Sequence, residues 1–259
     1  MEEYLEFAKE IAYGAGKIML RYSKENKEIS FKGDRTIVTK ADKEINEYLI
    51  ERVKETFPEH CVDGEEEQFG KNKYVWVCDP IDGTAMYARN IPVSLFSLAL
   101  VIDGESKLGV VYDPYMDKIY TAIKGKGAYQ NDKKIKVNDY KIDNIRSMGH
   151  FDLCSRPKYN SIKLLSKLRE KTYTIDLGSI IRAGMCVATG DFTYAIFNGN
   201  KHKNCDIAAV KVIVEEAGGI VTNIYGEEQR YDEDINGAII CNKEAYEEVK
   251  NIINRRYKL

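Results

Sequence analysis

Apolar residues recur every three or four positions near the start of the chain, which is the spacing of one face of an α-helix. The first such series is Leu5, Ala8, Ile11, Ala12, Ala15, Ile18, Met19 and Tyr22. A second, shorter series is Ala41, Ile45, Tyr48, Leu49 and Val53. Both series predict amphipathic helices, and we expect the two helices to lie side by side on one face of a sheet.

The next part of the chain carries short apolar runs of the kind found in strands. Tight turns such as Asp103-Gly104 separate them. Closely spaced strands joined by tight turns favour antiparallel pairing, so a largely antiparallel sheet is predicted in this half. The expected strands are 74–78, 95–102, 107–112 and 118–123.

After Ile145 the pattern changes to an alternation of helices and strands, which favours a layered α/β arrangement. Gly218-Gly219 marks the end of one of these helices. Neither a repeat nor a flexible linker divides the chain. We therefore predict an α+β layered sandwich (α/β/α/β/α), with halves 1–142 and 143–259 packed as one body. The expected helices are 162–168, 179–188, 207–217 and 243–254, and the expected strands are 173–175, 192–197, 220–222 and 238–241.

Composition excludes several classes of protein. The chain has 259 residues, of which 44% are hydrophobic, enough for a substantial core. Its mean hydropathy is -0.43, and no apolar run approaches the ~18 residues that cross a bilayer. The acidic start does not resemble a signal peptide, so we expect a cytoplasmic protein without a membrane span. A net charge of -2 gives no general attraction to nucleic acid.

The six cysteines are scattered without a CxxC pair, and most lie in apolar surroundings. Buried free thiols are therefore expected. The three histidines have no zinc-finger spacing to a cysteine pair, which argues against a zinc site.

The candidate chemistry centres on the segment Asp79-Pro80-Ile81-Asp82-Gly83-Thr84, which follows an apolar strand. Side chains at strand ends commonly form sites in layered folds. Gly83 lets the backbone approach a ligand closely, and the amides of Gly83 and Thr84 are suited to cradling a phosphate oxygen. Taken alone, Asp82-Gly83 is also consistent with an ordinary hairpin turn.

Further acids change that interpretation. Asp63-Gly64-Glu65-Glu66-Glu67 lies upstream, and Asp206 follows Asn204-Cys205 at the start of a predicted helix. Each has a simpler explanation, the first as a solvated loop and Asp206 as a helix N-cap. Together they supply the several carboxylate oxygens that Mg²⁺ requires.

Four ordered motifs resemble the inositol monophosphatase family of metal-dependent, lithium-sensitive sugar phosphatases, and the resemblance extends over essentially the whole chain. The motifs are Val38-Thr39-Lys40-Ala41-Asp42, Gly64-Glu65-Glu66, Trp76-Val77-Cys78-Asp79-Pro80-Ile81-Asp82-Gly83-Thr84, and Asp206-Ile207-Ala208-Ala209 followed by Glu216-Ala217-Gly218-Gly219. The resemblance implies a phosphomonoesterase with two or three Mg²⁺ per site (Mn²⁺ being an alternative), a small phosphorylated metabolite as substrate, and a homodimer or homotetramer.

The same resemblance implies a role for each matching residue. Glu65, Asp79 and the Ile81 carbonyl would hold one metal ion, and Asp79, Asp82 and Asp206 a second. Asp82, Gly83 and Thr84 would bind the phosphate. Asp42 and Thr84, with Glu65, would orient and deprotonate the attacking water. Thr39 to Asp42 also fits a helix capping box, and the two interpretations are compatible.

Departures from the family motif concern the substrate. Cys205 replaces a tryptophan, and the segment 195–203 lacks the glutamate that binds an inositol hydroxyl in animal relatives. Lys203 matches a basic residue of archaeal relatives that accept both fructose 1,6-bisphosphate and inositol phosphates, although Lys201 and Lys203 also fit a solvated loop. Candidate substrate contacts are Lys32, Ile180, Asn198 and Lys203. A 3'-phosphoadenosine 5'-phosphate or NADP phosphatase, and a non-catalytic sugar-phosphate-binding relative, stay open as alternatives.

Overall fold

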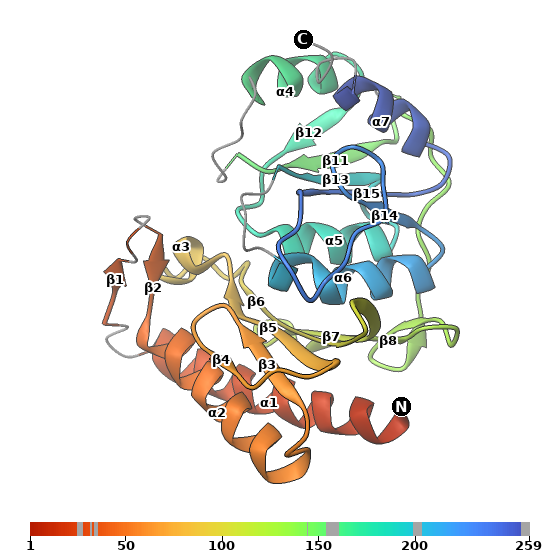
Figure 1. The fold of residues 1–259 in the computed structure, drawn as a ribbon. Coiled ribbons are helices and arrows are strands. Elements are labelled where there is room, and N and C mark those ends of the chain that lie inside the picture. Colours follow the sequence, from red (N-terminus) through yellow and green to blue (C-terminus); the bar gives the residue numbers. More distant parts are fainter. Residues whose placement is uncertain are drawn as a thin grey trace.

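A computed structural model describes residues 1–24, 28–31, 33, 36–143, 145–153, 161–198 and 204–254. Its elements stack in five layers, from a helical layer at the N-terminus to another near the C-terminus (Figure 1). The predicted layered α+β class is confirmed. In order, the layers are helices α1 and α2, an eight-stranded sheet, helices α5 and α6, a five-stranded sheet, and helices α4 and α7.

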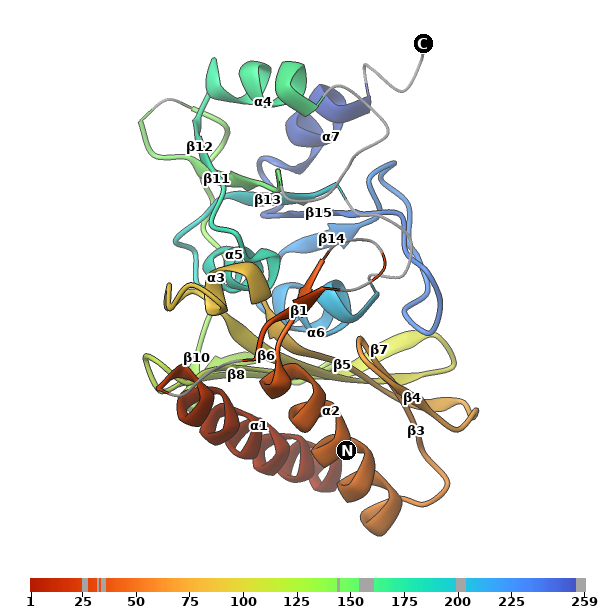
Figure 2. The ribbon, with the colours of Figure 1, turned by 90° about the vertical axis from the view of Figure 1, so that its left-hand side faces the viewer.

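The two N-terminal helices form where the apolar spacing predicts them, α1 (Glu2–Ser23) and α2 (Lys40–Thr56). Both pack on the same face of the larger sheet and on each other (Figure 2). Their buried side chains, with those of the covered sheet face, form one core cluster that includes Trp76. In the part of the chain that the structure describes, no helix is long and apolar enough to span a membrane.

The larger sheet is mostly antiparallel, as predicted, with one parallel pair between β3 and β5. A short helix, α3 (Thr84–Tyr87), follows β5, and a separate pair, β1 (Ser30–Phe31) and β2 (Ile37–Val38), precedes α2. The strands of the sheet, in spatial order, are β10 (Lys133–Lys134), β9 (Ala128–Gln130), β8 (Lys118–Ile123), β7 (Glu105–Asp113), β6 (Leu95–Ile102), β5 (Tyr74–Asp82), β3 (Cys61–Gly64) and β4 (Gln68–Phe69).

The smaller sheet combines parallel and antiparallel pairs. Helices α5 (Ile180–Ala188) and α6 (Asn204–Glu216) lie between the two sheets, and α4 (Ser161–Arg169) and α7 (Tyr246–Asn254) cover its outer face (Figure 1). Because α6 is enclosed by both sheets, nearly all of its residues are buried. Its strands, in spatial order, are β12 (Tyr173–Ile175), β11 (Met148–Phe151), β13 (Tyr194–Phe197), β15 (Ala238–Cys241) and β14 (Ile220–Thr222).

Candidate metal and phosphate site

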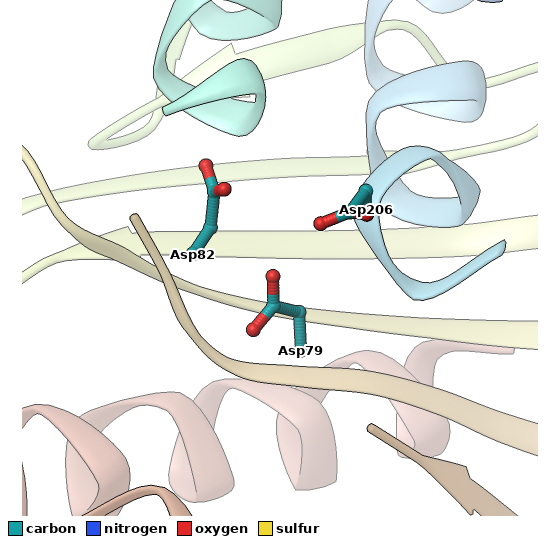
Figure 3. Close-up of side chains that lie close together, drawn as sticks. All are labelled: Asp79, Asp82 and Asp206. Atoms are coloured by element: carbon teal, nitrogen blue, oxygen red, sulfur yellow. The ribbon is translucent and has the colours of Figure 1, made fainter. Parts of the chain in front are cut away.

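Three buried aspartates from the two halves of the chain meet at one end of β5. Asp79 and Asp82 lie on β5, and Asp206 lies in the first turn of α6. Each offers one carboxylate oxygen, and these three oxygens all lie within 4.8 Å of one another. Figure 3 shows Asp206 reaching from α6 toward the two aspartates of β5. The fold thus brings together acids that are more than 120 positions apart in the sequence.

An irregularity in strand pairing lets both β5 aspartates face this cluster. Asp79 lies opposite Ser97 and Asp82 opposite Leu95, so β5 advances three residues while β6 advances two. In a regular strand, residues three apart point to opposite faces, and an extra residue changes this alternation. The strand expected to end at residue 78 therefore continues to Asp82. The reason is that the bulge keeps the acidic motif paired with β6.

The start of α5 holds the Asp82 carboxylate. The Ser179 hydroxyl and the Ile181 amide, at 2.8 Å, both donate hydrogen bonds to Asp82 Oδ2. Ser179 is also the N-cap of α5, and its Oγ accepts a hydrogen bond from the Arg182 amide. We did not identify Ser179 and Ile181 as site residues from the sequence, although a serine before an apolar helix is a recognisable cap signal.

Glu65 lies beside β5 because its backbone continues the pairing of β3. The Glu65 amide donates to the Cys78 carbonyl at 3.1 Å, one residue before Asp79. The turn that carries Glu65 is closed by a hydrogen bond from the Gly64 amide to the Glu67 carbonyl. Asn46, one turn along α2 from Asp42, donates to the same carbonyl at 3.2 Å. Helix α2 therefore contacts the Glu65 turn directly.

Gly64 has no room for a side chain. An added Cβ would lie 1.9 Å from Asn46 Oδ1 and 2.8 Å from the Glu67 carbonyl oxygen. We expect Gly64→Ala to displace the Glu65 turn, lowering stability by about 1–3 kcal/mol and activity at limiting Mg²⁺ by roughly ten- to a hundredfold. Thermal unfolding and Mg²⁺ titration of activity measure both effects.

Two further variants test the cause. Gly33→Ala is the control for thermal unfolding, because its added Cβ meets no described atom within 4 Å. Asn46→Ala in the Gly64→Ala background removes the obstructing amide and should restore part of the lost activity. If Gly64→Ala leaves Mg²⁺ dependence at its wild-type value, the turn does not position a metal ligand.

Asp42 is completely buried at the start of α2, where its side chain forms the capping box that the sequence predicts. Its Oδ2 accepts hydrogen bonds from the Thr39 amide at 2.8 Å and the Thr39 hydroxyl at 2.6 Å, as a capping residue does. Its Oδ1 lies 3.5 Å from the Thr84 hydroxyl. Burial, with a smaller contribution from the negative charges of Glu65 and Glu66, raises the pKa of Asp42 to about 7, although the hydrogen bonds from Thr39 act in the opposite direction.

Thr84 stands between Asp42 and the strand that carries the aspartates. Its hydroxyl lies 2.9 Å from the Ile81 carbonyl, closer than to Asp42. Gly83 precedes it with φ of 77°, and a Cβ there would lie 2.8 Å from the Gly178 carbonyl oxygen. A glycine is therefore required, and the chain turns sharply enough to present the Thr84 hydroxyl to either acceptor.

The predicted substrate contacts are placed less completely. Lys32 and Lys203 lie outside the described residues, and so does Lys201. Asn198 is buried after β13, and its side-chain amide (Nδ2) donates a hydrogen bond to the Asp152 carbonyl. Ile180 is buried in the core cluster that fills the space between the sheets. Their roles toward a substrate stay predictions.

The residues present fit a hard divalent cation. Carboxylate oxygens this close repel one another in a buried site, and a cation with oxygen ligands offsets that repulsion. The described cysteines, Cys61, Cys78, Cys186, Cys205 and Cys241, are free thiols, and Cys205 is buried directly before Asp206. The acidic donor set suits Mg²⁺ or Mn²⁺ better than a metal that prefers sulfur ligands.

Known sequences and structures match this chain over most of its length. Residues 1–257 match the description of the inositol monophosphatase family. A fructose-1,6-bisphosphatase/inositol-1-monophosphatase of Aquifex aeolicus is 36% identical over 236 residues, covering 86% of each chain. The structure of the Thermotoga maritima IMPase is 28% identical, with a TM-score of 0.86, and covers 98% of this chain and 97% of that one. A structure of SaIMPase-II with 2'AMP bound is 27% identical, with a TM-score of 0.83 and coverage of 97% and 94%.

The layered fold, the acidic cluster and these relatives define the class of protein as a phosphatase that hydrolyses phosphomonoesters. The chain belongs to the inositol monophosphatase family.

Proposed function

We propose that this enzyme is a Mg²⁺-dependent phosphatase of small sugar or polyol phosphates, acting on inositol 1-phosphate, fructose 1,6-bisphosphate or both. The observation that carries the proposal is the convergence of Asp79, Asp82 and Asp206 beside the pair formed by Asp42 and Thr84. Two or three Mg²⁺, or Mn²⁺ in their place, would be held by these aspartates together with Glu65 and the Ile81 carbonyl.

Each of several residues of the chain would have a separate role in hydrolysis. Bound divalent cations would neutralise the phosphate charge and lower the pKa of water. The backbone amides of Gly83 and Thr84 would donate hydrogen bonds to a phosphate oxygen. Asp82, at the start of the same turn, would contribute to phosphate binding through the metal ion that it holds. Asp42 would accept the proton of the attacking water, and the neighbouring Thr84 hydroxyl would orient that water. Glu65 adds negative charge next to Asp42, which favours proton uptake.

The choice of sugar phosphate rests on two observations. The Aquifex aeolicus relative is named for both activities. Lys203 precedes Asp206 by three positions, in a segment that has no acid between Ala195 and Lys203. A cationic side chain there favours a substrate with a second phosphate over a neutral polyol. We therefore propose fructose 1,6-bisphosphate alongside inositol 1-phosphate.

A nucleotide phosphatase is the second candidate. SaIMPase-II, which is similar over 97% of this chain, has been solved with 2'AMP bound. A 2'-phosphate on adenosine is also the group that distinguishes NADP⁺. This supports testing NADP⁺ and 3'-phosphoadenosine 5'-phosphate beside the sugar phosphates.

The test is phosphate release from purified enzyme with excess Mg²⁺, reported as kcat/KM for each of the four substrates, because that ratio measures discrimination. We expect the sugar phosphates to rank first. Ranking of NADP⁺ or 3'-phosphoadenosine 5'-phosphate above both would replace the proposal with the second candidate. Calorimetric binding without release from any substrate would show a non-catalytic relative.

Lys203→Ala tests the second-phosphate contact. We expect KM for fructose 1,6-bisphosphate to rise about tenfold, as expected for a charge-assisted hydrogen bond of about 1.5–3 kcal/mol, while KM for inositol 1-phosphate changes little. Lys201→Ala serves as the control for loss of positive charge in the same segment. Equal effects of Lys203→Ala on both substrates would reject this contact.

The assembly and setting of the enzyme stay predictions. We propose a homodimer or homotetramer, a cytoplasmic location and no nucleic-acid partner. Light scattering during size-exclusion chromatography measures the mass of the assembly directly. A mass of 29.6 kDa, that of one chain, would contradict the proposed dimer or tetramer.

A further inference from the structure

Arg182 joins the central helix α5 to the first half of the chain. Its Nε–H donates to the Val93 carbonyl at 2.7 Å, and its Nη2–H donates to Asp113 Oδ2 at 2.8 Å. Asp113, at the end of β7, is fully buried, and only 16% of the Arg182 side chain is exposed. A buried ion pair with this geometry fixes two elements relative to each other.

Both contacts of Arg182 are themselves anchored. Asp113 Oδ1 accepts hydrogen bonds from the amides of Tyr115 and Met116, which close the turn after β7. Val93 adjoins Ser94, whose hydroxyl donates to the Gly83 carbonyl at 3.1 Å. The guanidinium therefore connects α5 to one end of the β7–β8 hairpin and to the segment that supports the phosphate turn.

The backbone of Arg182 belongs to the group that holds Asp82. Its amide donates to Ser179 Oγ at 3.1 Å, and the Ser179 hydroxyl donates to Asp82 Oδ2. The Ile181 amide, one residue before Arg182, donates to the same oxygen. A displacement of the first turn of α5 would therefore move two donors of the Asp82 carboxylate together.

We infer that Arg182 is a positioning residue for Asp82: its ion pair with Asp113 and its bond to Val93 fix the first turn of α5, and that turn orients the carboxylate for metal binding. The inference rests on the metal role proposed above for Asp82. Partners that orient a ligand tune the affinity for the metal, and their loss costs about ten- to a hundredfold. Arg182 contacts neither substrate nor metal in this scheme.

The experiment separates positioning from simple stability. Arg182→Met alone leaves the Asp113 charge buried without its cation, which destabilises the fold strongly. The informative variant is Arg182→Met combined with Asp113→Asn, because it removes both charges while the new amide side chain retains the oxygen that closes the β7–β8 turn. The matched control is Lys211→Met, which removes another mostly buried cation, paired with Glu215 on the neighbouring helix α6 and with Glu228 in the segment after β14.

The experiment measures the binding of Mn²⁺ alone to the protein. The electron paramagnetic resonance signal of free Mn²⁺ reports how much remains unbound, and thermal unfolding is measured in parallel. We expect the Arg182→Met/Asp113→Asn variant to bind Mn²⁺ about tenfold more weakly or worse. Lys211→Met should stay within about twofold of wild type. In activity assays, the Mg²⁺ concentration for half-maximal rate should rise more than kcat at saturating Mg²⁺ falls. Arg182→Lys, which keeps the positive charge but has one donor nitrogen in place of two, should give an intermediate affinity.

Each other result has a distinct meaning. If the double variant keeps wild-type Mn²⁺ affinity while Ser179→Ala loses it, Arg182 contributes stability only and the inference is wrong. If Lys211→Met weakens Mn²⁺ binding as much as the double variant does, the effect is a general loss of packing and the inference is also wrong. If Asp82→Asn binds Mn²⁺ like wild type, the metal role of Asp82 fails, and with it the part of the proposed function on which this inference rests.

Discussion

Replacing Asp82 by Asn is expected to reduce kcat/KM at fixed Mg²⁺ by about a thousandfold. The substitution preserves size but removes one of three carboxylate charges that lie within 4.8 Å of one another. Metal ions contribute several kcal/mol to stabilising charge at phosphorus, and about 4 kcal/mol corresponds to roughly a thousandfold in rate. Phosphate release measured over a range of Mg²⁺ concentrations tests this prediction.

The same substitution should stabilise the metal-free protein. Three carboxylates converge at the end of β5, and removing one negative charge relieves their mutual repulsion. We therefore expect the thermal midpoint measured in chelator to rise for Asp82→Asn while activity is lost. Asp191→Asn, an exposed site with the same chemical change, should alter neither quantity. Activity above a tenth of the wild-type value would remove Asp82 from the proposed metal site.

Asp42→Asn is expected to lower kcat by about a hundred- to ten-thousandfold, the usual contribution of a general base. Asn cannot accept the proton of the attacking water, yet its side-chain oxygen can still receive the hydrogen bonds from Thr39. Helix α2 should therefore remain capped, and the loss should appear in kcat with little change in the affinity for Mg²⁺. Rate measurements at saturating Mg²⁺ and substrate give this result directly.

The pH dependence of stability supplies an independent test of Asp42. Its pKa in the folded, metal-free protein is raised from 3.8 to about 7, mainly because the carboxyl is buried. Between these values the folded state binds more protons than the unfolded state, so this group makes stability fall as pH rises from about 4 to 7. A pKa difference of one between the two states corresponds to about 1.4 kcal/mol, so the effect is on the order of a few kcal/mol.

The Asp42→Asn variant has no such titration. In chelator, its stability advantage over wild type should therefore grow between pH 5 and pH 8, as measured by denaturant unfolding at each pH. Thr39→Val, which removes one of the hydrogen bonds that favour the charged carboxylate, should increase the pH dependence of the otherwise wild-type protein. A constant difference between wild type and Asp42→Asn across this range would show that burial does not perturb Asp42.

Local patterns were enough to predict several parts of the molecule. The apolar spacing of 5–22 predicted α1, because a helix packed on one side of a sheet buries a single face. Thr39 to Asp42 predicted the start of α2, where Asp42 accepts two hydrogen bonds from Thr39. The strand predicted at 95–102 is β6, and its bounds are those expected. These features depend on residues close in sequence, so a one-dimensional pattern contains them.

The chemistry of the site was also readable from the sequence, but its geometry was not. Asp79 and Asp82 were predicted as ligands from motif resemblance, whereas regular strand alternation would place them on opposite faces. The bulge opposite β6 resolves this, and it depends on pairing between strands. Likewise, the donors that hold Asp82 come from Ser179 and Ile181, almost a hundred residues away.

The sequence by itself thus determined the layered fold class and the family, and it singled out the acidic residues, because residue type, periodicity and short motifs are properties of the chain. Only the tertiary structure decided that Asp206 lies next to Asp79 and Asp82. It also decided that Asn46 contacts the Glu65 turn and that Arg182, on α5, forms an ion pair with Asp113. Each of these contacts joins elements far apart in sequence. Their distances follow from how α2 packs on the larger sheet and how the two sheets enclose α5 and α6, which no local pattern specifies.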